Sequence, residues 1–234
     1  MTPPAPALVA APVWDIFVRL FHWSLATLVV IAVVTGKVGG NAIQWHMVAG
    51  GGILALVLFR VMWGFAGGEY ARFISFVASP ARTLRFARGL IGRGHEYVIG
   101  HNPLGGWMVL AMLALFTTQA VFGLFSNDEI MTTGPLARYV SDETSIAFMS
   151  RHRILAPVLI VLVALHIAAV LYHLFVKNEN LVRPMLNGRK SLPAALAAEA
   201  RDGRKASIAL GVTLLAVAIA VVVTVFQWSK LFPG

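Results

Sequence analysis

The chain has 234 residues, of which 58% are hydrophobic and only 12% are charged, and its formal net charge is +9. A soluble domain carries about 25% charged residues, so this chain has too little charge to cover a globule with a soluble surface. It contains no cysteine, which excludes disulfides, thiolate metal sites, iron–sulfur clusters and covalently attached c-type haem. We therefore expect an all-α integral membrane protein.

Five apolar stretches have the length of about 20 residues that a helix needs to cross the hydrocarbon core. They cover residues 13–35, 45–65, 104–125, 153–176 and 206–228. Helices are expected because lipid cannot satisfy free backbone polar groups and because the stretches lack the alternation of barrel strands. Tryptophans near the ends of the stretches are typical of residues at the membrane interface. They are Trp14, Trp45, Trp63, Trp107 and Trp228.

The charges of the connecting loops predict the orientation. Counted with Arg60 near the end of the second stretch, the loop between the second and third stretches has six arginines and two glutamates. The loop between the fourth and fifth has seven basic and three acidic residues. Each of these loops carries a net charge of +4, whereas the connection after the third stretch carries −1. By the positive-inside rule the N-terminus is cytoplasmic and the C-terminus lies on the opposite side of the membrane, as in a multi-pass protein with five spans. Membrane topology and contact with anionic lipid therefore explain the excess of basic residues better than nucleic-acid binding does.

Three further segments have local signals. Residues 1–12 are rich in Pro and Ala and lack a basic n-region, so we read them as a tail before a retained first helix. Ser79 and Pro80 suit the start of a short helix whose arginines alternate with apolar residues, either on the inner membrane surface or in a solvated loop. We expect His95 in a solvated loop. The acidic residues of segment 126–150 make it a candidate docking surface.

Histidines in the stretches carry the main functional signal, since ionisable groups inside a span are costly and therefore functional candidates. His46 and His152 each lie in the first turn of a stretch that enters from outside, so their depths match. His166 follows His152 by fourteen residues, which puts both on one helix face about 21 Å apart. His22 lies about 12 Å from the cytoplasmic end of its helix, so it matches either His166 or His173 in depth.

Two His–His pairs stacked in a four-helix bundle are what two b-type haems need, because each iron takes one axial nitrogen from each side. The alternative for any single histidine is a hydrogen bond between helices. The chain lacks HxxxH, HxxHH and HExxH motifs, and the spans hold almost no carboxylates, which disfavours di-iron, zinc and Ser–His–Asp sites. Small residues that would leave room for a macrocycle follow four of the histidines. They are Ala26, Gly50, Ala156 and Ala169.

Several short sequence segments form a specific pattern when their order and spacing are taken together. They are RLFHW at 19–23, WHMVAG at 45–50, RVMWG at 60–64, HNPLGG at 101–106, and His152 with Leu165 and His166. In this order and spacing the chain resembles the prokaryotic cytochrome b561 family, which includes the cytochrome b subunits of nickel-iron hydrogenases. The resemblance covers about residues 13–190.

The resemblance implies a four-helix core holding two haem b groups, one near each membrane face. By position, His46 and His152 bind the outer haem iron, and His22 and His166 bind the inner one. The implied domains are the tail at 1–12, a haem domain at 13–190, and a linker with a fifth helix at 191–234. We expect this fifth helix, which lacks histidine, to pack outside the core.

Polar groups on the inner side offer a site for a quinone, whose chemistry needs a hydrogen-bond donor and a protonatable group. The quinone residue is His101 or His173, with Arg60 and Asn102 nearby. Alternatively, Asn102 caps a helix, and Arg60 or His173 binds haem propionates. Beside His152, the flanking residues Arg151 and Arg153 pair with outer-haem propionates or face lipid headgroups.

The function expected is that of a diheme b-type cytochrome of a respiratory chain, which passes electrons between an external redox protein and membrane quinone. Examples of such an external protein are a c-type cytochrome and a hydrogenase. One alternative is a superoxide:quinone oxidoreductase, in which the basic residues beside the outer haem attract the anion directly. The other is a non-redox membrane anchor or transporter, which predicts no haem.

Overall fold

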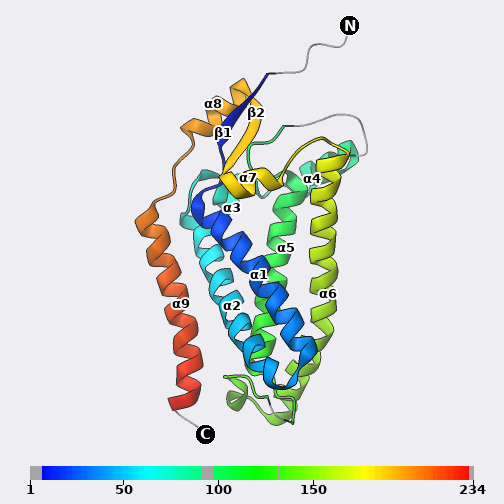
Figure 1. Ribbon diagram of the computed structural model, residues 1–234, viewed down its shortest axis with the longest axis vertical. Coiled ribbons are helices and arrows are strands. Elements are labelled where there is room, and N and C mark those ends of the chain that lie inside the picture. The colour runs from blue at the N-terminus through cyan, green and yellow to red at the C-terminus, as the bar shows by residue number, and fades with distance from the viewer. Residues whose placement is uncertain (1–6, 91–96, 131, 232–234) are drawn as a thin grey trace. The chain divides into compact units, whose positions relative to one another are not determined.

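The computed structural model describes residues 7–90, 97–130 and 132–231, and His95 lies outside them. Five of its helices are long and apolar enough to cross a membrane. They are α1 (Ile16–Val38), α2 (Ile43–Ala66), α5 (Pro103–Phe125), α6 (Asp142–Phe175) and α9 (Ile208–Leu231) (Figure 1). All five predicted spans are thereby confirmed as helices.

Helix α6 begins earlier than predicted because its first turn is favourable for a helix N-terminus. The Ser141 hydroxyl oxygen accepts from the Thr144 backbone N–H at 3.3 Å, which is an N-cap bond. Asp142 and Glu143 place negative charge in the first turn, where the helix dipole favours it. These polar residues extend the helix beyond the apolar stretch. The apolar stretch predicted only the part of the helix that is suited to contact with lipid.

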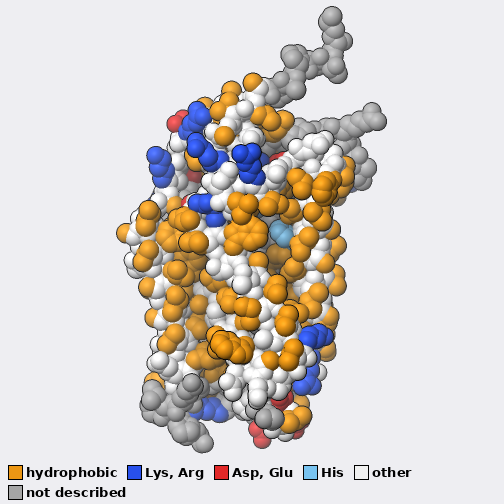
Figure 2. All heavy atoms as spheres, viewed as in Figure 1, with side chains coloured by type: hydrophobic (Ala, Val, Ile, Leu, Met, Phe, Trp, Pro, Cys, Tyr) orange, Lys and Arg blue, Asp and Glu red, His pale blue; other side chains and the backbone are white. Residues whose placement is uncertain are grey.

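The surfaces of the long helices are apolar, as a membrane environment requires. Large apolar side chains are exposed on each of them, including Val30 at 62%, Ile154 at 67% and Ile208 at 69%. Figure 2 shows hydrophobic side chains over these helices, whereas Lys and Arg gather over β2, α7 and α8. Exposed apolar area on this scale is costly in water, so the structure is that of an all-α integral membrane protein.

The chain divides into two compact units, and every long helix contributes residues to both. The first unit contains Met1–Leu20, Met62–Leu110 and Leu165–Gly211. The second contains Phe21–Val61, Ala111–Ala164 and Val212–Gly234.

The first unit contains a small sheet that the sequence did not predict. Strand β1 (Leu8–Pro12) pairs antiparallel with β2 (Arg189–Pro193), and helix α8 (Ala194–Asp202) packs on them. The buried residues at their contact are Ala11, Val13, Ile99, Leu192, Ala197 and Ala200. Part of the predicted tail at 1–12 is therefore the strand β1. Its partner strand β2 crosses the predicted domain boundary between residues 190 and 191.

The short helices of the first unit are α3 (Phe73–Phe76), α4 (Pro80–Leu90) and α7 (Val182–Asn187), with a 3-10 turn η2 (Glu69–Ala71). Helix α4 is the predicted one: the Ser79 hydroxyl oxygen accepts from the Arg82 N–H at 3.3 Å. Its Arg82, Arg85 and Leu84 side chains are exposed. The helix is thus confirmed, and its place on the membrane surface stays a prediction.

Trp63 does not lie at a lipid interface, so our interpretation of this residue was wrong. Its side chain is fully buried in the first unit, and its indole Nε1 donates to Asp15 Oδ2 at 3.1 Å. The other carboxylate oxygen of Asp15 accepts from the Val18 N–H at 2.8 Å and so caps α1. A buried indole N–H needs a partner, and Asp15 supplies it inside the protein.

Asp15→Ala is expected to lower the free energy of unfolding by about 1–3 kcal/mol, because it removes both the helix cap and the carboxylate oxygen that accepts from the indole N–H of Trp63. Asp15→Asn retains a carbonyl oxygen for one of these donors and should lose less. Thermal unfolding in detergent measures both variants. A wild-type melting temperature for Asp15→Ala would show that the bridge adds no stability.

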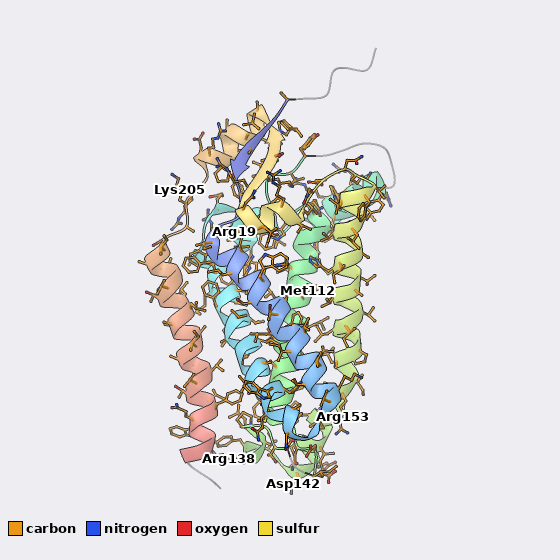
Figure 3. The ribbon with its side chains drawn as sticks, viewed as in Figure 1. Arg19, Met112, Arg138, Asp142, Arg153 and Lys205 are labelled. Atoms are coloured by element: carbon orange, nitrogen blue, oxygen red, sulfur yellow. The ribbon has the colours of Figure 1, made fainter. Side chains whose placement is uncertain are left out.

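In the second unit, α9 packs against α2 and α5. Leu54, Ala55 and Val222 are buried together, with Leu58, Ala120, Leu124 and Phe226 around them. The 3-10 turn η3 (Ala137–Tyr139) holds the end of α9, because Arg138 donates to the Trp228 carbonyl at 3.0 Å and the Trp228 indole donates to the Tyr139 hydroxyl at 2.8 Å. Arg138 is labelled in Figure 3.

Candidate functional site

His46 on α2 and His152 on α6 face each other in the second unit. Their ring centroids are 5.9 Å apart, and their planes are nearly perpendicular at 84°. A ligating imidazole nitrogen lies about 2 Å from its metal ion, so two axial rings need roughly this centroid distance to hold one ion between them. The structure therefore brings together the two histidines that matching depth had paired.

Both rings are oriented by backbone carbonyls of neighbouring helices. His46 Nδ1 lies 2.8 Å from the Ala32 oxygen on α1, and His152 Nδ1 lies 2.9 Å from the Gln119 oxygen on α5. A carbonyl can only accept, so Nδ1 carries the proton in both rings and Nε2 keeps its lone pair. A hydrogen bond of this kind fixes the tautomer and the orientation of a histidine that ligates a metal.

Gln119 makes a second contact with the same histidine. Its Nε2 donates to the His152 carbonyl at 3.0 Å, while its Oε1 is buried and has no hydrogen-bond partner among the described residues. A buried acceptor without a partner is costly, and it marks a place where a further group or water belongs. The sequence signal that we missed was a single amide inside an apolar helix.

The space beside His46 is open. A Cβ added at Gly50, one helical turn after His46, would meet no atom within 4 Å. Of the other small residues expected to leave room, Ala156 is half-buried, whereas Ala26 and Ala169 are exposed. With two facing imidazoles held at Nδ1, an unsatisfied acceptor and free space, the residues present fit a haem whose iron is held by His46 and His152.

The predicted inner pair is divided between the two units. His22 is half-buried in the second unit, with its ring centroid 5.0 Å from that of Trp23. His166 is half-buried in the first unit. Their pairing therefore stays a prediction.

His173 belongs to a buried polar cluster in the first unit. Its Nδ1 lies 2.9 Å from Glu179 Oε2, and the Lys190 ammonium lies 3.0 Å from Glu179 Oε1 and donates to the Val98 carbonyl at 2.8 Å. His173 and Lys190 are only 8% and 7% exposed. We had counted Glu179 and Lys190 as loop charges alone, because nothing in their spacing shows that β2 brings Lys190 to the end of α6.

Glu179 is held in its ionised form. Burial by itself would raise the pKa of this carboxyl, but the hydrogen bond from His173 and the charge and hydrogen bond of Lys190 outweigh it and lower the pKa from 4.5 to about 2. A carboxylate that remains charged at physiological pH can orient the His173 ring without itself carrying protons.

His101 lies between two aromatic rings of the first unit. Its ring centroid is 4.6 Å from that of Trp14 and 4.7 Å from that of Phe76. The next residue, Asn102, accepts from the Gly105 N–H at 2.7 Å, so the capping alternative for Asn102 is confirmed.

One edge of His101 lines a cavity of about 250 Å³ in the same unit. Its polar lining consists of Tyr70, Ser75, Arg82, Tyr97, His101 and Glu199. Typical ligand pockets have volumes of about 300–1,000 Å³, so this cavity is slightly smaller than most of them. It suits a ring-sized group rather than a whole isoprenoid lipid.

The three arginines of the predicted site differ in burial. Arg60 on α2 is only 2% exposed in the second unit. Arg151 and Arg153, on either side of His152, are exposed on α6 (Figure 3 labels Arg153). The Arg151 guanidinium lies 5.9 Å from the Phe148 ring centroid. Their exposure suits both lipid headgroups and an anion that approaches from outside.

Three known proteins are similar to part of this chain. A protein of Azotobacter vinelandii named "Probable Ni/Fe-hydrogenase B-type cytochrome subunit" is 31% identical over 139 residues, which cover 48% of this chain and 56% of that protein. The protein of the same name from Azotobacter chroococcum mcd 1 gives the same values. The one from Bradyrhizobium diazoefficiens is 24% identical over 139 residues, 48% of this chain and 53% of its own length.

The chain thus matches a little more than half the length of these relatives. No solved structure matches it significantly. The family model described as prokaryotic cytochrome b561 matches residues 13–188, which is well over half of the chain and includes all four predicted haem ligands. The chain therefore belongs to the prokaryotic cytochrome b561 family.

Proposed function

We propose that the chain is a diheme b-type cytochrome of the bacterial inner membrane that passes electrons between a periplasmic redox partner and the quinone pool. The observation that carries this proposal is the facing pair of His46 and His152, each with Nδ1 held by a backbone carbonyl. Haem b, when bound, supplies a one-electron couple whose potential depends on axial ligands, hydrogen bonds and burial. Family membership supports this cofactor.

The chain's own residues bind and orient. His46 and His152 present two neutral imidazole nitrogens, and the carbonyls of Ala32 and Gln119 keep the rings from turning. His22 and His166 are proposed to hold the second haem in the same manner. His166 follows His152 by fourteen residues, which is a rise of about 21 Å along α6.

The quinone is proposed to bind at the cytoplasmic side, at His173 or His101. The His173 imidazole is oriented by a carboxylate that stays ionised, which suits a group that exchanges protons with a quinone. His101 borders a cavity that suits the quinone ring. Asn102 serves as a helix cap, and Arg60 is proposed to bind a haem propionate.

The external partner is proposed to be a redox protein such as a hydrogenase or a c-type cytochrome, since the relatives are named as hydrogenase cytochrome subunits. Segment 126–150 is proposed as the docking surface. Glu129, Asp142 and Glu143 are exposed there. Asp128 has a structural role instead, because its Oδ1 accepts from the backbone N–H groups of Ile130 and Thr132.

Direct oxidation of superoxide is a second candidate function. The exposed Arg151 and Arg153 flank His152, and two cations beside the outer haem site would attract a small anion. Haem reduction by superoxide alone, without a partner protein, would favour this function. A requirement for a partner protein would favour the relay.

The purified wild-type protein is expected to contain about two haem b per chain, because four axial histidines form two pairs. A reduced-minus-oxidised visible spectrum with b-type bands, combined with haem and protein quantification, tests this. Two resolved midpoint potentials in a redox titration would separate the haems. An absence of b-type bands would refute the proposed function and favour the membrane anchor or transporter.

A further inference from the structure

Helix α1 presents both a carbonyl and a missing side chain to the His46 ring. The Ala32 oxygen accepts from Nδ1 at 2.8 Å. Gly36 follows Ala32 by four residues, so it lies one helical turn further along the same face. A Cβ at Gly36 would come within 2.8 Å of His46 Nδ1 and 3.1 Å of Cε1, closer than such atoms normally approach.

Helix α5 repeats this arrangement at the other histidine. The Gln119 oxygen accepts from His152 Nδ1 at 2.9 Å, and Gly123 follows Gln119 by four residues. A Cβ at Gly123 would lie 3.2 Å from His152 Cε1 and 3.4 Å from Nδ1. Two helices of unrelated sequence thus hold their histidines with the same pattern, a carbonyl followed four residues later by glycine.

We propose that Gly36 and Gly123 are positioning residues that set the redox potential of the outer haem. Their missing side chains let each imidazole reach a helix carbonyl, which keeps the proton on Nδ1 and directs Nε2 toward the iron. The inference rests on the proposed function, since it takes His46 and His152 as the axial ligands. Hydrogen bonds from Nδ1 raise ligand basicity, and ligand environment is one of the levers on haem potential.

The direction of the effect follows from the hydrogen bonds. An alanine at either position pushes the ring from its carbonyl and weakens the bond, so Nε2 becomes less basic. A less basic ligand stabilises ferric iron less, and the midpoint potential of the outer haem rises. A purely structural role predicts no such change, because replacing a glycine inside a helix with alanine ordinarily favours the helix.

Redox titration of purified Gly36→Ala and Gly123→Ala proteins, followed by visible spectra, tests the proposal. The outer-haem midpoint should rise in both, or the outer haem should be lost, while the inner-haem midpoint stays at the wild-type value and shows that the protein is folded. The larger effect is expected for Gly36→Ala, whose contact is 2.8 Å against 3.2 Å at Gly123. Gly51→Ala is the control, since its Cβ would meet the Phe226 ring at 3.4 Å and Val222 Cγ1 at 3.7 Å but neither histidine. This variant should leave both midpoints unchanged.

An unchanged outer-haem midpoint in both variants overturns the positioning role and leaves the proposed function intact. So does an equal shift of both haems, which indicates a general disturbance. If Gly36→Ala does not accumulate in the membrane, Gly123→Ala decides alone, because its contact is looser. A wild-type protein without haem contradicts the proposed function itself, which distinguishes the two failures.

Discussion

Replacing His46 or His152 with alanine is expected to remove one of the two haems and to leave the other in place. In the proposed outer site each imidazole would supply one of the two nitrogens that hold the same iron, and a non-covalent haem with a single protein ligand is held weakly. Haem quantification should give about one haem per chain in either variant, against about two in the wild type. The difference spectrum should retain the inner-haem bands, and the double variant should lose no more haem than either single one.

His101→Ala is the matched control, because His101 is half-buried in the chain but belongs to neither pair. Its haem content should equal that of the wild type. For the inner site, His22→Ala and His166→Ala should each remove the other haem, and His173→Ala should keep both. Full haem content in His166→Ala together with loss in His173→Ala would make His173 the inner ligand.

Glu179→Ala is expected to destabilise the protein by about 3–5 kcal/mol, the usual cost of breaking a buried ion pair from one side. The variant leaves the Lys190 ammonium and the His173 Nδ1 buried without their carboxylate, whose side chain is only 15% exposed. Chemical denaturation in detergent, followed by loss of the haem absorbance, measures the change. Lys190→Met with Glu179→Ala should be more stable than Glu179→Ala alone, because it leaves no unpaired cation.

The same cluster predicts how stability depends on pH. The pKa of Glu179 falls from 4.5 in the unfolded chain to about 2 in the folded protein. A carboxyl with a lowered folded pKa contributes its full stability above the unfolded value and loses it as the pH falls toward the folded value. The wild type should therefore lose this contribution between pH 4.5 and about 2, and the difference from Glu179→Ala should shrink over that range. A constant difference would contradict the assignment.

The helices and the outer histidine pair could be predicted because two constraints act on them directly. A bilayer demands apolar stretches of about 20 residues, and the fixed rise of a helix converts residue spacing into depth. Helix α4 was predictable for a local reason, the capping preference of Ser79. Each of these predictions rests on residue types and spacings within single helices or at their ends.

The rest depends on contacts that leave no local mark. The carbonyls of Ala32 and Gln119 are backbone atoms, so any residue could carry them. The hydrogen-bond partner of Trp63, near the end of α2, is Asp15, which directly precedes α1. A tryptophan at the end of a span is ordinarily interpreted as an interfacial residue. For the inner pair, depth left both His166 and His173 as partners for His22, and only the family resemblance favoured His166.

The pairing of β1 with β2 has a consequence for synthesis of the chain. Translation proceeds from the N-terminus, and domains tend to fold in that order. Residues Leu8–Pro12 are made before α1, whereas their partner strand Arg189–Pro193 emerges only after α1, α2, α5 and α6 have been made. The His46–His152 pair can therefore assemble before the first strand finds its partner, and closure of this small sheet marks a late step in biogenesis.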